Sequence, residues 1–431
     1  MRASAALCEQ RFLTYLGRLT EAVGHRDRHE PLKFYLTGLC LSGERKSIEP
    51  MAARLDPRHA SARHQSLHHF ATQAAWDDLA LLRVARQEVL STLDRHGGLL
   101  AWAVDDTGMP KKGEHSVGVA RQYCGNVGKQ DNCQVAVSIS LVNETVSIPA
   151  IWRLYLPEEW AGDRLRRAKV GVPSDVRFQT KGQILLDQID LLRKEGVPTA
   201  PVTADAGYGV SSEFRRALTD RGLTYVVGVQ SLTKVWPPGK GPLPPARWKG
   251  RGRPSLRMRR DARHLPITVL QLARDLPPTA WKSVTWKEGS KGELTSRFAR
   301  VRVRTAHRDF LRKEAWPEEW LLVEWPRGEK APTKYWLSTV PEAEDLEVMV
   351  RLAKVRWRIE RDYEELKEEF GLDHFEGRGW RGFHHHASLC IAAYAFTAAE
   401  RARLSPPQAL DFLSVPALPR GFRPRGSPRS R

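Results

Sequence analysis

The sequence has few of the features that mark membrane proteins or disulfide-bonded proteins. Its 431 residues include only five cysteines, an odd number without a CxxC pair, which argues against a disulfide framework and against a zinc ribbon. The longest apolar stretch, Leu389–Ala399, is too short to cross a bilayer, and Met1–Phe12 lacks the apolar core of a signal peptide. We therefore expect a soluble cytoplasmic protein with no membrane partner.

Acidic residues are scarce relative to basic ones. The chain has 69 Lys and Arg against 50 Asp and Glu, which gives a formal net charge of +19. Such a surface attracts polyanions, of which nucleic acid is the most common. Apolar residues make up 41% of the chain, enough to bury a sizeable core, and the length allows two or three domains of about 150 residues.

Composition and periodicity divide the chain into five parts. The expected order is a helical, DNA-binding domain at 1–95, the first part of an α/β core at 96–230, a β-rich insertion at 231–342, a helical second part of the core at 343–400, and a basic disordered tail at 401–431. In the first part, Ile48–Leu55 and a run from Ala60 are separated by Asp56–Pro57. Two short helices around a tight turn suit a helix-turn-helix and equally any small bundle.

The core alternates between strand and helix patterns. Strands are predicted at Gly98–Asp106, Gln134–Leu141, Val146–Leu156, Pro201–Asp205 and Thr224–Val229, with helices at Ile184–Leu192 and near Ser211–Thr219. Three consecutive strands followed by this alternation indicate an α/β fold with a mixed sheet flanked by helices. The segments that connect the first three predicted strands contain no crossover helix, which argues against a purely parallel sheet.

The insertion and the segment after it have different patterns. Strands are predicted at Phe298–Thr305, Trp320–Trp325 and Lys334–Val340, and one long helix at about Glu342–Phe370. Eight tryptophans fall in the insertion, and one of them could stack on an extruded base, although Trp is mostly a core residue. His384–His386 could suggest a metal site, but adjacent helical residues point in different directions, and we predict a surface or DNA-facing role.

Three carboxylates stand out by their position. Asp105 and Asp106 close an apolar strand, Asp205 ends a second one, and Glu360 lies on the long predicted helix. Taken singly, each has an ordinary explanation, as a turn-forming Asp or as an exposed ion pair with Arg356. Taken together, carboxylates from two strands and a helix would form the hard-oxygen site that Mg²⁺ or Mn²⁺ prefers. Two such ions support phosphodiester chemistry, which matches the basic surface.

At these residues the sequence resembles the DDE transposases of bacterial insertion sequences, which have an RNase H-like catalytic domain. The resemblance runs from about Gly98 to His386. It is carried by Asp105–Gly108 with Lys111–Gly113, by Ser116–Tyr123, by Asp205–Gly209 and by the helix around Glu360.

The resemblance implies an RNase H-like mixed sheet with a β-rich insertion before the last catalytic helix. It also implies that Asp106, Asp205 and Glu360 are the catalytic residues and bind Mg²⁺, with Mn²⁺ as a substitute. Asp106 is favoured because the family places its Asp directly before Thr, and Asp105 is the alternative.

One branch of the family carries a Tyr-Arg-Glu-Lys signature that contacts phosphates of the transposon end. Arg356, Glu360 and Lys367 match its residue types and spacing, and fall on one narrow strip of an ideal helix. Ala353 stands where the signature has Tyr, so a hairpin-forming route of cleavage is not implied. Further candidate phosphate contacts are Lys111, Lys112, Arg121 and the Lys249–Arg253 cluster.

The implied function is that of a cut-and-paste transposase. It would cleave transposon ends and join the 3′-hydroxyl to target DNA, so the expected partner is double-stranded DNA at the inverted-repeat ends and the target. The family further implies a homodimer on paired ends and a nucleoid-associated location in a bacterial cell. Two alternatives remain: a non-catalytic DNA-binding protein on the same scaffold, for which Ala353 is a weak indication, and a cellular RNase H-like nuclease.

Overall fold

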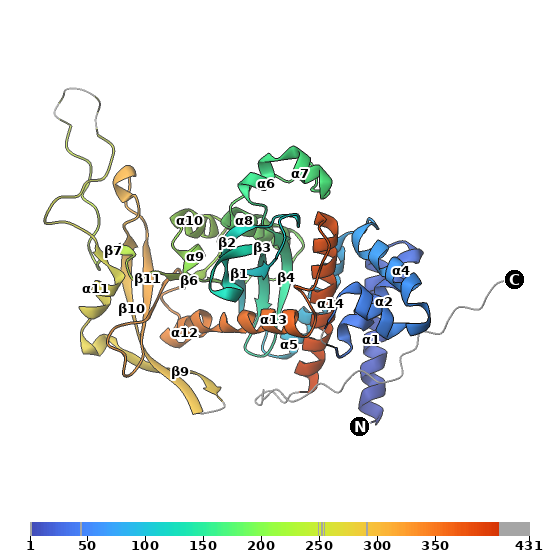
Figure 1. The fold of residues 1–431 in the computed structure, drawn as a ribbon. Helices are drawn as coiled ribbons and strands as arrows, with labels where there is room; N and C mark the ends of the chain where they lie inside the picture. The colour runs from blue at the N-terminus through green and yellow to red at the C-terminus, as the bar shows by residue number, and fades with distance from the viewer. Residues whose placement is uncertain are drawn as a thin grey trace. The chain divides into compact units, whose positions relative to one another are not determined.

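The computed structural model describes residues 2–43, 45–248, 250, 253, 255–289 and 292–404. They form two compact units, drawn in Figure 1. Unit 1 consists of the residues up to Leu99, Asp106–Ile184 and the residues from Arg358, and unit 2 of Leu100–Asp105 and Leu185–Trp357. These boundaries differ from the five predicted domains, which remain predictions.

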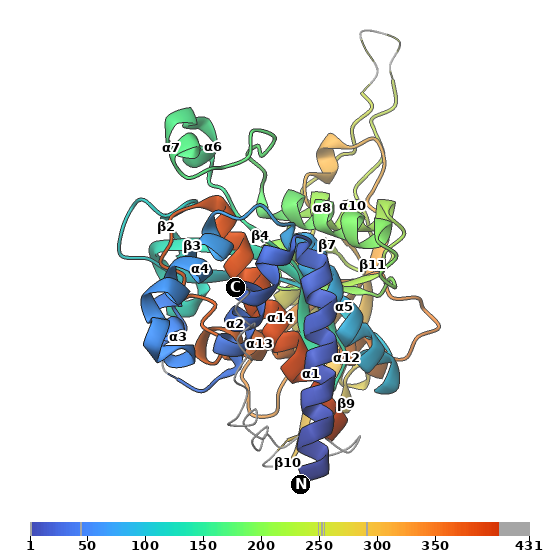
Figure 2. The ribbon, with the colours of Figure 1, turned by 90° about the vertical axis from the view of Figure 1, so that its right-hand side faces the viewer.

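The first part of unit 1 is helical. Its helices are α1 (Arg2–Val23), α2 (His29–Cys40), α3 (Ile48–Leu55), α4 (Ala60–Thr72) and α5 (Asp78–Arg95). Figure 2 shows α1 as the long blue helix. The predicted pair of short helices is present as α3 and α4, joined by a single 3₁₀ turn. This arrangement confirms the helices but leaves their DNA-reading role a prediction.

The helix α14 (Trp380–Leu404) is the centre of unit 1. It packs against β4 (Ser147–Leu154) and against α2, α4 and α5 (Figure 1). The Tyr15 hydroxyl of α1 donates to the Ala392 carbonyl of α14 at 2.9 Å. Helices from both ends of the chain therefore share one core.

Strand β1 (Ala101–Pro110) belongs to both units, because the boundary falls between Asp105 and Asp106. In unit 1, the N–H of Lys111 donates to the Asn132 carbonyl at 2.9 Å, so this end of β1 runs beside β3 (Lys129–Val142). Strands β2 (Ala120–Cys124) and β4 both pair with β3 in antiparallel fashion. The remaining helices of unit 1 are α6 (Glu158–Gly162), α7 (Arg164–Lys169), the start of α8 (Lys181–Lys194) and α13 (Trp357–Glu368).

In unit 2, β1 is parallel to β5 (Val202–Ala204), and β5 is parallel to β6 (Tyr225–Val229). From β6 the sheet continues in antiparallel pairs, so the predicted β-rich insertion extends the core sheet. The further strands are β12 (Lys334–Ser338), β11 (Glu318–Trp325), β10 (Gly292–Thr305), β7 (Lys234–Trp236), β8 (Ile267–Thr268) and β9 (Lys282–Gly289). The helices of unit 2 are α9 (Ala206–Gly209), α10 (Ser212–Asp220), α11 (Val269–Arg274), α12 (Leu346–Val355) and most of α8.

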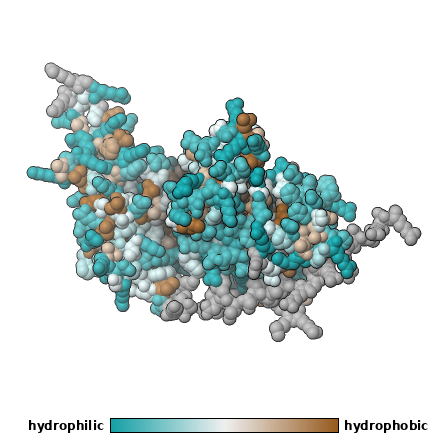
Figure 3. Space-filling model, in the orientation of Figure 1, coloured by the Kyte–Doolittle hydropathy of each residue, from teal (hydrophilic) through white to brown (hydrophobic). Residues whose placement is uncertain are grey.

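The predicted α/β class is confirmed. Unit 2 holds a mixed sheet with parallel and antiparallel pairs, against which α9 and α12 pack at β6, and in unit 1 α5 and α14 pack on β4. Within the described part of the chain, no helix is long and apolar enough to cross a membrane. On the face drawn in Figure 3, hydrophilic residues predominate and hydrophobic ones form small scattered groups.

Two predictions about the C-terminal third need correction. The single long helix at Glu342–Phe370 is wrong, because the structure has α12 and α13 with a one-residue break at Arg356. Arg356 keeps helical dihedral angles, but its N–H points to the carbonyl of Lys354 instead of continuing the regular helix ladder. Of the predicted tail, 401–404 belong to α14, and 405–431 lie outside the described residues.

Candidate active site

The two adjacent carboxylates on β1 have different partners. Successive side chains of a strand point to opposite faces, so Asp105 and Asp106 diverge. The Asp105 carboxylate lies 2.8 Å from the Arg356 guanidinium in unit 2. The Asp106 carboxylate lies 2.9 Å from the Lys181 ammonium in unit 1. Both carboxylates are half-buried and each has a cation beside it, which offsets the cost of taking a charge out of water.

Asp205 follows β5 and caps α9. Its carboxylate accepts hydrogen bonds from the N–H groups of Gly207 at 2.9 Å and Tyr208 at 3.3 Å. This is the N-cap geometry that Asp favours, and it fixes the side chain through the main chain of the next turn.

The glycines around Asp205 are required by close packing of α9 on β6. A Cβ on Gly209 would lie 2.0 Å from the Gly228 carbonyl oxygen, and a Cβ on Gly228 would lie 2.9 Å from the Ala206 nitrogen. The two glycines thus let the turn after Asp205 contact the backbone of β6.

Glu360 and Lys367 lie on α13, seven residues apart and therefore on nearly the same side of the helix. The Lys367 ammonium donates to the Gly108 carbonyl of β1 at 3.1 Å, and burial lowers its pKa. The side of α13 that carries Lys367 therefore meets the strand on which Asp106 lies. Glu360 itself is exposed.

Two buried residues hold α13 in place. Asp362 accepts hydrogen bonds from the hydroxyls of Ser147 and Tyr394, both at 2.7 Å, and Tyr363 contacts the Ser138 hydroxyl. Burial raises the pKa of Asp362 to about 6. The helix that presents Glu360 is thus tied to β3, β4 and α14.

The predicted phosphate-binding cations differ in their surroundings. The Lys111 ammonium donates to the Phe375 carbonyl at 2.9 Å, and burial lowers its pKa, so this residue holds the loop after α13. Lys112 and Arg121 are exposed. Of the Lys249–Arg253 cluster, Lys249, Arg251 and Gly252 lie outside the described residues.

The candidate residues are distributed over both units. Unit 1 contains Asp106, Glu360, Lys367, Lys111, Lys112 and Arg121, and unit 2 contains Asp105, Asp205 and Arg356. Within the part of the chain that the structure describes, no group of three or more His, Cys, Asp or Glu side chains is placed to hold a metal ion. The structure does bring a cation to Asp106, because the Lys181 ammonium contacts its carboxylate. Carboxylate oxygens of this kind are the ligands that Mg²⁺ prefers.

Lys181 is the residue that sequence reasoning missed. It is separated from Asp106 by 75 positions, so spacing could not connect the two. One local signal was available. Lys181 is the first residue of α8, where the helix dipole disfavours a positive charge.

The predicted surface or DNA-facing role of His384–His386 is wrong. All three side chains are buried, with exposed fractions of 7%, 2% and 2%. The Tyr35 hydroxyl donates to His386 Nδ1, and His386 Nε2 donates to the Gly371 carbonyl, both at 2.8 Å. Burial lowers the pKa values of His385 and His386 to about 4. The prediction was wrong because α14 packs against α2, α4, α5 and β4, which bury these three histidines.

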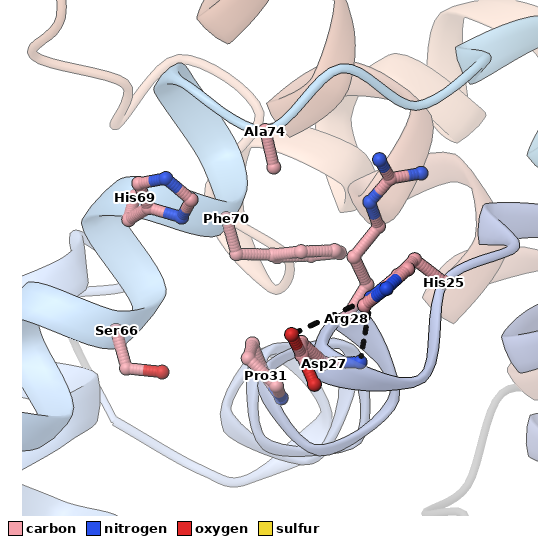
Figure 4. Close-up of a pocket in the computed structure, with 8 residues that line it drawn as sticks. All are labelled: His25, Asp27, Arg28, Pro31, Ser66, His69, Phe70 and Ala74. Atoms are coloured by element: carbon pink, nitrogen blue, oxygen red, sulfur yellow. Dashed lines mark hydrogen bonds and ion pairs between the residues drawn. The ribbon is translucent and has the colours of Figure 1, made fainter.

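A pocket of about 450 Å³ lies within the N-terminal helices of unit 1 (Figure 4). It has a single carboxylate, that of Asp27, and none of the candidate active-site residues. It is lined by His25, Asp27, Arg28, Pro31, Ser66, His69, Phe70 and Ala74.

Known families, curated proteins and solved structures each include matches to this chain. A family model described as DDE superfamily endonuclease matches residues 18–293, well over half of the chain. This stretch includes Asp106 and Asp205 and ends before Glu360. Over 205 residues the chain is 32% identical to the probable transposase for insertion sequence element IS701 of Microchaete diplosiphon.

The IS701 alignment covers 47% of this chain and 49% of that protein, so the chain spans about half the length of this curated relative. Among solved structures, the cryo-EM structure of the piggyBac transposase synaptic complex with hairpin DNA matches with a TM-score of 0.36 and 11% identity. That match covers 90% of this chain and 74% of the other.

Proposed function

Because the chain belongs to the DDE superfamily endonucleases, we propose that it is the transposase of a bacterial insertion sequence. It cleaves double-stranded DNA at the inverted-repeat ends of the element and joins the released 3′-hydroxyl to target DNA. The likeness to the probable IS701 transposase supports this assignment, as does the net charge of +19, which suits a polyanionic substrate.

Divalent-metal dependence is general in this superfamily, and we propose that Mg²⁺ is the ion here, with Mn²⁺ as a substitute. Asp106, Asp205 and Glu360 would hold it through carboxylate oxygens. When bound, a pair of such ions would supply Lewis-acid stabilisation of the attacking and leaving oxygens of the phosphodiester. The chain's own part is to hold these three carboxylates on β1, after β5 and on α13.

The basic residues around this site would contact DNA phosphates. Arg356 and Lys367 carry the charges of the proposed signature, and Lys112 and Arg121 are exposed on β2 and the loop before it. Lys111 already donates to a main-chain carbonyl of the loop after α13, and would act on DNA mainly by supporting that loop. We further propose that two copies act on paired ends and that the protein works on the bacterial nucleoid in the cytoplasm.

One observation carries the proposal. The Asp106 carboxylate is half-buried in the middle of β1, which continues beyond the predicted end to Pro110, faces a cation, and lies on the strand that the Lys367 side of α13 contacts. A carboxylate placed there without a cation would be costly. The helix that meets this strand presents Glu360, the third carboxylate of the proposed site.

The test is cleavage of DNA that carries the inverted repeats, with Mg²⁺ present. Asp106→Asn, Asp205→Asn and Glu360→Gln should each lower the cleavage rate by about 10³-fold or more, since metal ligation supplies several kcal/mol of transition-state stabilisation. Asp220→Asn, a surface change on α10, is the matched control and should keep the wild-type rate.

The same assay separates the alternatives. If Asp105→Asn abolishes cleavage and Asp106→Asn does not, Asp105 is the ligand on β1. If the wild-type protein binds the ends but never cuts them with Mg²⁺ or Mn²⁺, the binding-only alternative holds and our proposal fails.

A further inference from the structure

Lys181 lies at a position that its helix does not explain. The start of α8 is already capped, because the Thr180 N–H donates to Gln183 Oε1 at 2.8 Å and the Gln183 N–H donates to Thr180 Oγ1 at 3.3 Å. This reciprocal pair is a capping box, which satisfies the first N–H groups of the helix. A lysine in this first turn is opposed by the helix dipole. The stability of the helix therefore does not explain a lysine at this position.

The ammonium is directed to Asp106. It lies 2.9 Å from Asp106 Oδ2 and 5.8 Å from the centre of the Tyr155 ring. The Lys181 and Asp106 side chains are 29% and 23% exposed, so the pair can be reached from solvent. An ammonium at this distance uses a lone pair that a divalent ion would need, and two cations on one oxygen repel each other.

Lysine is suited to leaving such a contact. Its ammonium is a compact point charge on a flexible four-carbon stem, unlike the planar guanidinium of the Arg356 that faces Asp105. A displaced Lys181 ammonium would remain within a side-chain length of Asp106, and could there contact a phosphate of DNA bound at that carboxylate.

We propose that Lys181 is a positioning residue that exchanges partners: it holds the Asp106 carboxylate while no metal is bound, and moves to a DNA phosphate when divalent ions bind. This inference rests on the proposed function, because it takes Asp106 as a metal ligand. It assigns to the start of α8 a role in both metal loading and DNA binding.

The first test measures Mn²⁺ binding to the full-length protein by calorimetry, without DNA. Lys181→Met removes the competing cation and should tighten Mn²⁺ binding about two- to fivefold, the range expected for a partly exposed ion pair. Lys181→Arg keeps the charge on a guanidinium that leaves the carboxylate less readily, so it should bind Mn²⁺ no more tightly than the wild type. Lys194→Met removes the same charge from the exposed far end of α8 and is the matched control. Thermal melts check that each variant is folded.

The second test measures DNA binding, with Ca²⁺ in place of Mg²⁺ to prevent cleavage. With Ca²⁺, Lys181→Met should weaken binding several-fold and reduce the dependence of log K on log salt by about one phosphate contact. Without a divalent ion, the same variant should bind DNA as the wild type does, because the wild-type ammonium is then held by Asp106.

The two proposals fail in different ways. If Asp106→Asn leaves Mn²⁺ binding unchanged, Asp106 is not a ligand and the proposed site is wrong. If Asp106→Asn abolishes Mn²⁺ binding while Lys181→Met leaves it equal or weaker, the site stands and the exchange of partners is overturned. An equal loss of DNA binding by Lys181→Met with and without Ca²⁺ would also overturn it.

Discussion

Around Asp205 in unit 2 the main chain sets the position of the carboxylate, whereas around Asp106 in unit 1 charged and titratable side chains do. Asp205 accepts from two N–H groups of α9, and α9 is pressed onto β6 through Gly209 and Gly228. Asp106 faces the Lys181 ammonium, and the end of its strand is joined to α13 by Lys367. The Asp205 region should therefore respond to an added Cβ, whereas unit 1, in which burial lowers the pKa values of His385 and His386 to about 4, should respond to pH.

The largest expected effect on stability comes from filling the space between α9 and β6. In Gly228→Ala the new Cβ would lie 2.9 Å from the Ala206 nitrogen, so the backbone itself must shift. Overpacking against a rigid neighbour costs up to about 3 kcal/mol. We expect a loss of this size in the free energy of unfolding from urea titrations.

The matched control for this change is Gly162→Ala, because a Cβ there meets nothing within 4 Å. It should change stability by no more than about 0.5 kcal/mol. A loss below about 1 kcal/mol for Gly228→Ala would mean that the turn after Asp205 can move, and the contrast between the two regions would disappear.

The next effect is an acid dependence in unit 1. His386 binds the Tyr35 hydroxyl and the Gly371 carbonyl at the start of the loop that Lys111 also holds. Burial lowers its pKa to about 4, from an ordinary value of about 6.5. Between these values the unfolded chain binds a proton that the folded chain does not. The stabilisation from neutral His386 is therefore complete above pH 6.5 and is lost as the pH falls towards 4.

This loss amounts to about 2 kcal/mol between pH 6.5 and 5, at about 1.4 kcal/mol per pH unit. His385, whose pKa is also lowered to about 4, acts in the same direction. Asp362 acts in the opposite one, because its pKa is raised to about 6 and its contribution is lost as the pH rises. Burial also lowers the pKa of His384 and raises that of Asp78, so three histidines oppose two carboxylates and a net loss on acidification remains.

The check is urea unfolding at pH 6.5 and 5, with hydrogen exchange to locate the loss. In His386→Gln, the free energy of unfolding at pH 6.5 should exceed that at pH 5 by about 2 kcal/mol less than in the wild type, because one titrating group is gone. Exchange at pH 5 should rise first in unit 1. His68→Gln, which removes an exposed imidazole of α4, is the control. Equal acid sensitivity of both units would remove the contrast.

The sequence predicted the regular elements better than the contacts between them. Period-two and helical spacing located β4, β6, α8 and α10 to within about three residues, because local patterns depend on burial of one face. Strand β3 begins at Lys129, before the predicted Gln134. The same patterns placed Asp205 directly after β5, but the predicted end of the first strand at Asp106 was wrong, because β1 continues to Pro110. The sequence did not predict that β12 pairs with β6, because apolar spacing indicates which residues form a strand but not which strand lies beside it.

Long-range contacts account for the predictions that were wrong or missing. Glu342–Phe370 has continuous helical periodicity, yet the helix breaks at Arg356, whose side chain pairs with Asp105 over 251 positions. Lys181 was overlooked because its partner is 75 positions away. No residue near His384–His386 in the sequence indicates that these side chains are buried. Their burial is seen only in the packing of α14.

The smallest expected effect tests whether the cap of α9 and the chemistry of Asp205 can be separated. Asp205→Ala removes the acceptor of the Gly207 and Tyr208 N–H groups and should cost about 1 kcal/mol of stability, whereas Asn caps a helix as well as Asp and should cost almost nothing. Ser211→Ala removes the cap of α10 in the same unit, and so measures the stability that is lost when only a helix cap is removed.

Cleavage assays on these variants complete the argument. Asn at 205 keeps the cap but lacks the second carboxylate oxygen and the charge, so Asp205→Asn should be as stable as the wild type and as inactive as Asp205→Ala. If Asp205→Asn is instead active while Asp205→Ala is not, the residue serves the fold alone. Capping α9 would then be the only role of Asp205. The contrast between the Asp205 and Asp106 regions would concern stability and not metal binding.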